Sequence, residues 1–317
     1  MTELTDPWPP LPYLEWQDTC VNLQLRSQIV GKIRLAQTPW LNHSWHVTLY
    51  VTARGLTTGP IPYERKVFRI DFDFLEHCLV IEASDGQRRK LPLIEQAIAD
   101  FYAAVFAALS DMGIHVRIFK KPSEIADGIP FDQDRRHRAY DAAAAQRFWR
   151  ALLQIERVLQ KFRSGFLGKA SPVHFFWGSF DLAVTRFSGR TAPPHPGKIP
   201  ALPDSVAREA YSHEVSSAGF WPGGGAIEYP AFYSYAYPQP EGFRAAQIRP
   251  AEAFYNETLG EFILPYDVVR TARSPEDSLW AFLQSTYEAA AECGGWDRAA
   301  LECPAGVPAV PRHYQVP

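Results

Sequence analysis

The stretch SPVHFFWGSFDLAVTRFSGR (residues 171–190) decides how the second half of the chain folds. Aromatic and β-branched residues dominate it on both sides of the Gly178-Ser179 pair. Such residues favour strands, and a Gly-Ser pair favours a turn, so we expect a hairpin. Because side chains alternate along a strand, His174 should point to the face opposite that of its immediate neighbours.

Two further strands are expected after this hairpin. EAYSHEVSSAGF (209–220) and AFYSYAYP (231–238) combine apolar, aromatic and β-branched residues, and WPGGG (221–225) supplies the bend between them. These glycines are not followed by a clear helix and lack the lysine of a phosphate-binding loop. They therefore do not indicate a nucleotide site.

The first half is expected to contain an antiparallel meander. Its strands are predicted in three alternating segments: HVTLYVTARGLTT (46–58), KVFRIDFDFLEH (66–77) and CLVIEASDGQRRKLPL (78–93). HVRIF (115–119) predicts one more strand, and the proline-rich and charged residues 120–138 indicate a connector.

Helical periodicity of apolar residues marks four other segments: 15–34, 94–112, 141–163 and 275–292. Asp141 is placed to cap the third of these helices, and Gly113 to end the second. The first helix also carries four long polar side chains, which we expect to keep their polar ends in water: Arg26, Gln28, Lys32 and Arg34.

Together these elements favour an α+β protein with antiparallel sheets and packed helices, because strands and helices mix without a βαβ repeat. We expect one compact unit of two halves, residues 1–138 and 139–301. The segment 302–317 lacks periodicity and is expected to form a tail.

Composition excludes several classes of protein. The chain of 317 residues has 32 basic and 35 acidic side chains, so the basic excess of a nucleic-acid binder is missing. No apolar run is long enough to span a bilayer, and the start lacks a signal-peptide pattern, so we expect a cytoplasmic protein without a membrane partner. The four cysteines are too widely spaced for a disulfide framework or a zinc knuckle.

Four aromatic-rich blocks carry a resemblance to a known family: NHSWHVTLYVTARGLTTGPIPY (42–63), HFFWGSFDLAVTRFSGR (174–190), YSHEVSSAGFWPGGG (211–225) and FLQSTYEAAAECGGWDR (282–298). The chain resembles, from about Trp8 to about Leu301, a bacterial family known only as a domain of unknown function. This resemblance implies membership of one family and no activity.

A metal site is the most specific functional hypothesis. The candidate ligands are two histidines, a carboxylate and a further histidine: His174, His213, Glu214 or Asp181, and His46 or His43. Two imidazoles and a carboxylate suit zinc or non-haem iron, and an open coordination position would let bound water or dioxygen react. The spacing matches no metal-binding motif. His213 and Glu214 are adjacent, so on a regular strand they point to opposite faces and only one of them could enter a given pocket. Each histidine can equally hydrogen-bond within the core.

A metal-free alternative is acid–base catalysis. A histidine of the same set would carry the proton, and a carboxylate, Asp181 or Glu214, would orient it. Arg186 or Arg190 would hold an anionic substrate through a bidentate contact. Arg186 can equally be a buried partner of Asp181, five residues away on the same strand.

Binding without turnover is a third possibility. Several rings could line a groove: Trp177, Trp221, Tyr229, Phe232, Tyr233, Tyr235 and Tyr237. Tyrosines at every second residue also fit a half-buried strand or a subunit contact, so an oligomer is possible.

We therefore expect a metal-assisted enzyme, a hydrolase or an oxygenase, that acts on a small polar or anionic substrate. The residues assigned to catalysis are Asp181, Glu214 and Arg186; those assigned to substrate binding are Trp177, Arg190, Trp221, Tyr229 and Tyr233; those assigned to zinc or iron are His174, His213 and His46. The alternative is a small-molecule binding or interaction protein that carries no metal.

Overall fold

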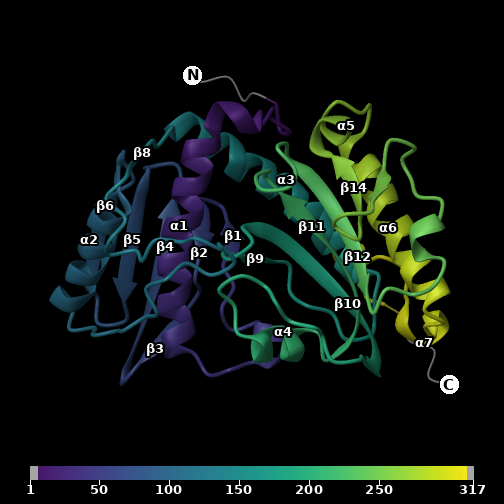
Figure 1. The fold of residues 1–317 in the computed structure, drawn as a ribbon, viewed down its shortest axis with the longest axis horizontal. Helices are drawn as coiled ribbons and strands as arrows, with labels where there is room; N and C mark the ends of the chain where they lie inside the picture. Colours follow the sequence, from purple (N-terminus) through teal and green to yellow (C-terminus); the bar gives the residue numbers. More distant parts are fainter. Residues whose placement is uncertain (1–5, 313–317) are drawn as a thin grey trace.

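The computed structural model describes residues 6–312, which fold around two antiparallel sheets (Figure 1). The first sheet has the order β1-β2-β4-β5-β6, with β3 paired to β4: β1 (Tyr50–Thr52), β2 (Gly55–Thr57), β3 (Ile61–Tyr63), β4 (Lys66–Asp73), β5 (Cys78–Ala83) and β6 (Arg88–Pro92). The second has the order β13-β14-β12-β11-β10-β9: β9 (His174–Phe176), β10 (Asp181–Thr191), β11 (His213–Trp221), β12 (Ala231–Tyr237), β13 (Phe254–Asn256) and β14 (Glu261–Pro265). A short separate pair joins β7 (Gln96–Ala97) to β8 (His137–Arg138).

Helices pack against both sheets, which confirms the expected α+β class. The α-helices are α1 (Tyr13–Gln37), α2 (Ile98–Asp111), α3 (Ala142–Ser164), α4 (Asp204–Ala210), α5 (Tyr266–Arg270), α6 (Pro275–Cys293) and α7 (Arg298–Leu301). Asp141 caps α3 as predicted, because its carboxylate accepts the Ala144 N–H at 3.0 Å. Pro275 begins α6, at a position where no backbone donor is needed.

The two sheets are joined edge to edge by one pair of residues. Leu49, the residue before β1, and Phe175 of β9 exchange both backbone hydrogen bonds, at 2.8 and 2.7 Å. The β1 edge of the first sheet is thus paired with the β9 edge of the second. Both side chains are fully buried and belong to a hydrophobic core that draws on both halves of the chain.

Helix α1 contacts both halves, and this reverses one expectation. Its neighbours are α2 and β3 of the first half and α3 of the second, and Figure 1 shows it running through the middle of the molecule. The four polar side chains expected in water are instead buried: Arg26, Gln28, Lys32 and Arg34. A helix with protein on several sides has little solvent face, so its polar groups must find partners inside.

One predicted strand is wrong, and another is shorter than predicted. HVRIF (115–119) lies outside any strand; burial alternates along it because one side faces the core, but no neighbouring strand pairs with it. The segment 209–212 ends α4 and forms a turn, and β11 begins only at His213. Period-two patterns report one-sided burial, whereas a strand also needs a partner for its backbone.

Two other features of the described residues bear on the sequence analysis. None of the described helices has the length and apolar character needed to cross a bilayer. The four cysteines are free.

The shared core predicts cooperative unfolding. Phe175→Ala should lower the free energy of unfolding by about 3 to 5 kcal/mol, because it leaves a cavity where the two sheets meet. Urea denaturation followed by circular dichroism and by tryptophan fluorescence should give one coincident transition. Leu14→Ala, at an exposed site, is the control and should change stability by less than about 0.5 kcal/mol. Two separate transitions in the wild type would show that the halves fold independently.

Candidate functional site

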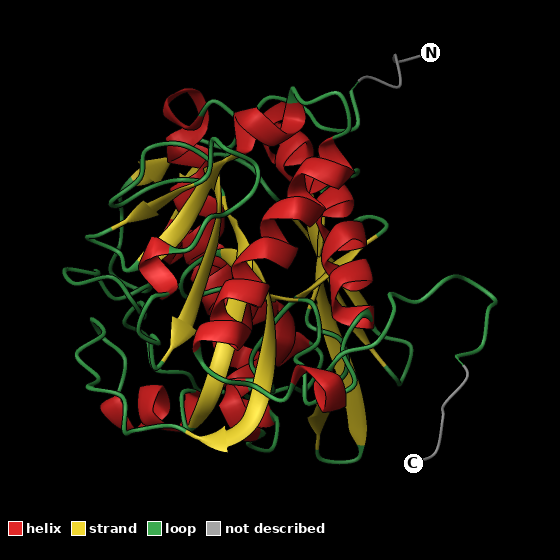
Figure 2. Ribbon diagram, turned by 90° about the vertical axis from the view of Figure 1, so that its right-hand side faces the viewer, coloured by secondary structure: helices red, strands yellow, loops and turns green. Residues whose placement is uncertain are grey.

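The second sheet has one apolar and one polar face. The apolar face is covered by α3 and α6, and its fully buried residues include Leu182, Val184 and Phe220. In Figure 2, helices lie in front of the strands and cover them. Residues paired directly across antiparallel strands share a face. The opposite face, called the polar face below, carries Asp181, Thr185, Ser217, Tyr233, Tyr235 and Glu261.

Asp181, at the start of β10, is held by two hydroxyl groups. The Ser179 hydroxyl donates to one carboxylate oxygen and the Tyr233 hydroxyl to the other. The side chain is only 6% exposed, and no basic group of the described residues pairs with it. Burial raises the pKa of Asp181, although the two hydroxyls act in the opposite direction.

Gly219 leaves the space that the Tyr233 hydroxyl needs. The two residues are paired in the ladder between β11 and β12. A Cβ atom on Gly219 would stand 2.5 Å from the Tyr233 hydroxyl oxygen, closer than real Cβ atoms come. Burial, followed by the nearby charge of Asp181, raises the pKa of Tyr233 well above its usual value. The phenol therefore stays protonated and donates.

Two glutamates belong to the same electrostatic environment. Glu261 lies on β14, and Glu124 comes from the connector between the halves. Burial first, and the charge of Asp181 second, raise the pKa of each glutamate to about 7. A side chain on Gly178 would overlap the Glu124 carboxylate, so this glycine leaves room for it.

Lys32 of α1 is the cation of this region. Its Nζ donates to the Ser123 hydroxyl at 2.8 Å and lies 5.5 Å from the ring centroids of Phe119 and Trp177. Burial lowers the pKa of Lys32 to about 8, and Glu124 opposes this shift. Lys32 therefore stays mostly protonated at pH 7.

Helix α1 also fixes the backbone around the site. Gln28 accepts the Ser123 N–H at 2.8 Å and donates to the Ser123 carbonyl at 3.0 Å. Gln24 donates to the Gly178 carbonyl at 2.8 Å. Two segments that carry site residues are thus tied to one helix.

Hydroxyl groups continue along the polar face. The Thr185 and Ser217 hydroxyls lie 2.9 Å apart, and the Tyr211 and Tyr235 hydroxyls 2.8 Å apart. The rings of Tyr233 and Tyr235 stack at 6.1 Å between centroids. Hydroxyls that both donate and accept, beside carboxyls that titrate near neutral pH, can bind a polar molecule and exchange protons with it.

Arg186 lies on the apolar face, away from Asp181. Its guanidinium stands 3.5 Å from the ring centroid of Phe162 and 4.3 Å from that of Tyr287, and it donates to the Phe162 carbonyl. It is 1% exposed. The structure therefore places this arginine between α3, α6 and the sheet, and it is not paired with Asp181.

The other residues assigned to the site are dispersed. Glu214 pairs with Arg190 at 2.6 Å, and Arg190 also donates to the carbonyls of Gly294 and Gly295 at the end of α6. Tyr229 is exposed, and Trp221 packs against a small cluster around Ile227. Two of the residues predicted to bind substrate lie near the residues described above. The Tyr233 hydroxyl donates to Asp181. Trp177 lies beside Lys32, and its indole N–H donates to the Val47 carbonyl.

The histidines lie around the turn before β1. His174 is 1% exposed, neither ring nitrogen has a hydrogen-bond partner, and burial lowers its pKa to about 3. The ring centroid of His213 is 5.8 Å from that of His43. His46 Nδ1 accepts the Leu41 N–H at 3.2 Å, so its proton sits on Nε2.

These imidazoles do not form a common ligand set. Within the described residues, one group of three or more donor side chains has ligand atoms within 4.8 Å of one another: Asp73, Glu76 and Cys78, on the first sheet. Asp73 already pairs with Arg54 at 2.6 Å. The donors assigned to zinc or iron therefore do not fit such a centre, and no step below passes through a metal.

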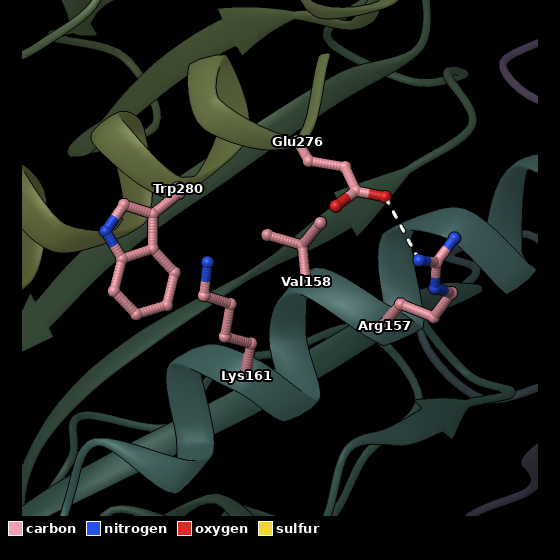
Figure 3. Close-up of a pocket in the computed structure, with 5 residues that line it drawn as sticks. All are labelled: Arg157, Val158, Lys161, Glu276 and Trp280. Carbon is pink, nitrogen blue, oxygen red and sulfur yellow. Dashed lines mark ion pairs between the residues drawn. The ribbon is translucent and has the colours of Figure 1, made fainter. Parts of the chain in front are cut away.

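Two surface cavities lie outside the polar face. One, of about 140 Å³ between α3 and α6, is lined by Arg157, Val158, Lys161, Glu276 and Trp280 (Figure 3). Arg157 and Glu276 pair at 3.3 Å, and Lys161 lies 4.8 Å from the Trp280 ring centroid, so its charges are satisfied within the cavity. The other, of about 380 Å³, is lined by Pro250, Glu252, Val268, Thr271, Ala272 and Ser278. Neither brings together groups suited to catalysis.

Three site residues escaped the sequence analysis: Lys32, Glu124 and Glu261. A signal for Lys32 exists, because Gln24, Gln28 and Lys32 recur at intervals of four and form one polar stripe along the helix. Glu124 and Glu261 carry no local signal, since a loop and a strand near the sheet edge normally display glutamates to water.

The comparisons with known proteins agree with the resemblance noted in the sequence. Neither the curated proteins nor the solved structures include a match to the chain. Residues 8–303 match the model of the Family of unknown function (DUF5996). Since the match spans nearly the whole sequence, the chain belongs to this family.

Proposed function

We propose that the polar face is the active site of an enzyme that transfers a proton to or from a small polar substrate. The supporting observation is the Asp181–Tyr233 pair. The buried carboxyl of Asp181 accepts hydrogen bonds from the Ser179 hydroxyl and from the Tyr233 phenol, for which Gly219 leaves space. An acid–base group works best when its pKa lies near the working pH. Burial moves the pKa of Asp181 in that direction.

Each residue of the site has a role in this proposal. Asp181 takes or returns the proton at its carboxylate oxygen, and Tyr233 donates a hydrogen bond that stabilises the charged carboxylate. Glu124 and Glu261, with pKa values of about 7, bind substrate as donors or as acceptors. Lys32 supplies a positive charge close to Glu124.

The pair can be tested without knowing the substrate. Purified protein is incubated with a filtered extract of small metabolites, and mass spectrometry follows which compounds are consumed. Asp181→Asn should slow consumption of the same compounds by about 100-fold or more, because an amide cannot accept the proton. Tyr233→Phe should slow it less, because the carboxylate loses one donor and remains.

The matched control is Asp71→Asn. Asp71 is a carboxylate on the first sheet that likewise accepts from a hydroxyl, Thr57 Oγ1, at 2.5 Å. This variant should consume the compounds at the wild-type rate. Wild-type turnover by Asp181→Asn would exclude the proton-transfer role, and binding of a compound without its consumption would favour a binding protein.

The raised carboxyl pKa values predict a pH dependence of stability. Between pH about 4.5 and about 7, Glu261 binds more protons in the folded than in the unfolded protein, so its ionisation weakens the fold as pH rises. Glu261→Gln should therefore shrink the difference in unfolding free energy between pH 5 and pH 8 by about 1 to 3 kcal/mol. Urea denaturation at the two pH values measures this.

Glu76→Gln is the control for this experiment. Lys90 lowers the pKa of Glu76, so Glu76 is largely ionised from pH 5 to pH 8 in both states of the protein. Its substitution should leave the difference between the two pH values unchanged. An equal effect of both substitutions would mean that Glu261 ionises like an ordinary surface carboxyl.

A further inference from the structure

The turn before β1 gathers buried side chains whose polar atoms have no hydrogen-bond partner. They are Arg34 Nε, Ser44 Oγ, His46 Nε2 and both ring nitrogens of His174. All four residues are at least nine-tenths buried. His43 and Ser44 also hold the left-handed backbone conformation, each with φ of 58°. Unpaired buried groups and successive strained residues are costly, and together they indicate a functional demand.

The bridge between the sheets brings these residues together. Because Leu49 pairs with Phe175 in antiparallel register, Tyr50 lies opposite His174 on the same face. The guanidinium of Arg34 stands 5.3 Å from the Tyr50 ring centroid and donates to the Thr48 carbonyl. The charge of Arg34 also lowers the pKa of His174, so this buried cation lies near the imidazole.

Ser44 and His46 complete the cluster from the turn itself. The His46 carbonyl accepts from the Thr38 hydroxyl, one helical turn beyond Arg34, at 3.3 Å. Val47 N–H donates to the Ser44 carbonyl at 3.2 Å, which folds the turn back on itself.

Each of these four residues has an unpaired group that can donate a hydrogen bond, although Ser44 Oγ and the second ring nitrogen of neutral His174 also accept. Arg34 Nε carries a hydrogen and has no acceptor lone pair. His46 Nε2 holds the proton, because Nδ1 accepts from Leu41. The Ser44 hydroxyl can donate, and the neutral ring of His174 keeps one N–H. Unpaired donors favour a ligand that accepts hydrogen bonds.

The charge of the region points to an anion. Arg34 forms no ion pair with any carboxylate of the described residues. Arg163 and Lys169 add positive charge near His174 and His43. Glu209 is the nearby acidic group: its Oε1 accepts the His43 N–H at 2.8 Å, and its Oε2 has no hydrogen-bond partner.

We propose that Arg34, Ser44, His46 and His174 form a binding site for an oxyanion, the carboxylate or phosphate group of the substrate. The register continues from His174 through Ala183 and Gly219 to Tyr233, so the site lies on the same face as Asp181. Two small residues separate the imidazole from the phenol. This proposal rests on the proposed function, because the anionic group is assigned to one end of the enzyme's substrate.

Thermal unfolding with inorganic probes tests the site directly. The wild-type protein is heated in increasing sodium phosphate or sodium acetate, with sodium chloride added to keep the ionic strength constant. The midpoint temperature should rise saturably by about 2 to 5 °C with at least one probe. Acetate mimics a carboxylate group, so the more effective probe identifies the kind of anion.

Three variants separate the cluster from general salt effects. Arg34→Met, which keeps a long unbranched side chain, should abolish the rise. His174→Leu should unfold no earlier than the wild type without anion, because it replaces an unpaired buried group by an apolar one. Its apparent affinity for the anion should fall about tenfold, as expected for one lost hydrogen bond. His115→Gln, at an exposed site, should respond like the wild type.

Two results would overturn the proposal: no saturable rise with either probe, or an equal rise in Arg34→Met. In the latter case the anion binds elsewhere. Asp181→Asn should show the full rise in midpoint temperature with the anion. If this variant binds the anion but no longer consumes the substrate, anion binding and proton transfer are separate functions of the two sites. Normal turnover by Asp181→Asn with an intact anion response would reject the proton-transfer role and keep the anion site.

Discussion

The backbone pair between Leu49 and Phe175 is the contact on which the rest of the structure depends. It joins two sheets whose facing edges would otherwise present unpaired N–H and C=O groups. Through it, residues from both halves of the chain enter one hydrophobic core. It also sets which side chains meet at the junction, since register decides that Tyr50 faces His174. This one backbone pair thus fixes both how the two halves pack and which polar side chains meet at the junction.

Helix α1 is the second consequence of this junction. Because it contacts both halves, it offers buried polar groups to segments that are far away in the sequence. Gln28 holds the backbone of Ser123, Gln24 holds that of Gly178, and Lys32 reaches the hydroxyl of Ser123. Long polar side chains in the interior are stable only when such partners satisfy them. The helix therefore positions the loops that approach the polar face.

The polar face and the turn before β1 are complementary in charge. Carboxyls with raised pKa values gather around Asp181, where burial favours the neutral form. Unpaired donors gather around Arg34. His174 and Asp181 share a face of the second sheet, on which Ala183 and Gly219 lie between His174 and Tyr233. A small molecule that carries an acidic group at one end and an exchangeable proton at the other would satisfy both.

The amino-acid sequence by itself determined the local elements and the class of the fold. Periodicity located α3 and α6, Asp141 marked the start of α3, and the stretch 171–190 formed its hairpin. The sequence also indicates Asp181 and Tyr233 as site candidates, because carboxylates among aromatic rings are typical of a small-molecule pocket. The positions of these helices and strands depend on local backbone preferences, which can be read from each segment of sequence by itself.

Only the tertiary structure decided which of these residues meet. The arginine expected to anchor an anion, Arg186, lies among aromatic rings on the apolar face, whereas Arg34, expected in water, is buried beside His174. Glu124 reaches the polar face from a connector without any local pattern. Burial and pKa depend on neighbours brought together from distant parts of the chain, and no local window of sequence contains them.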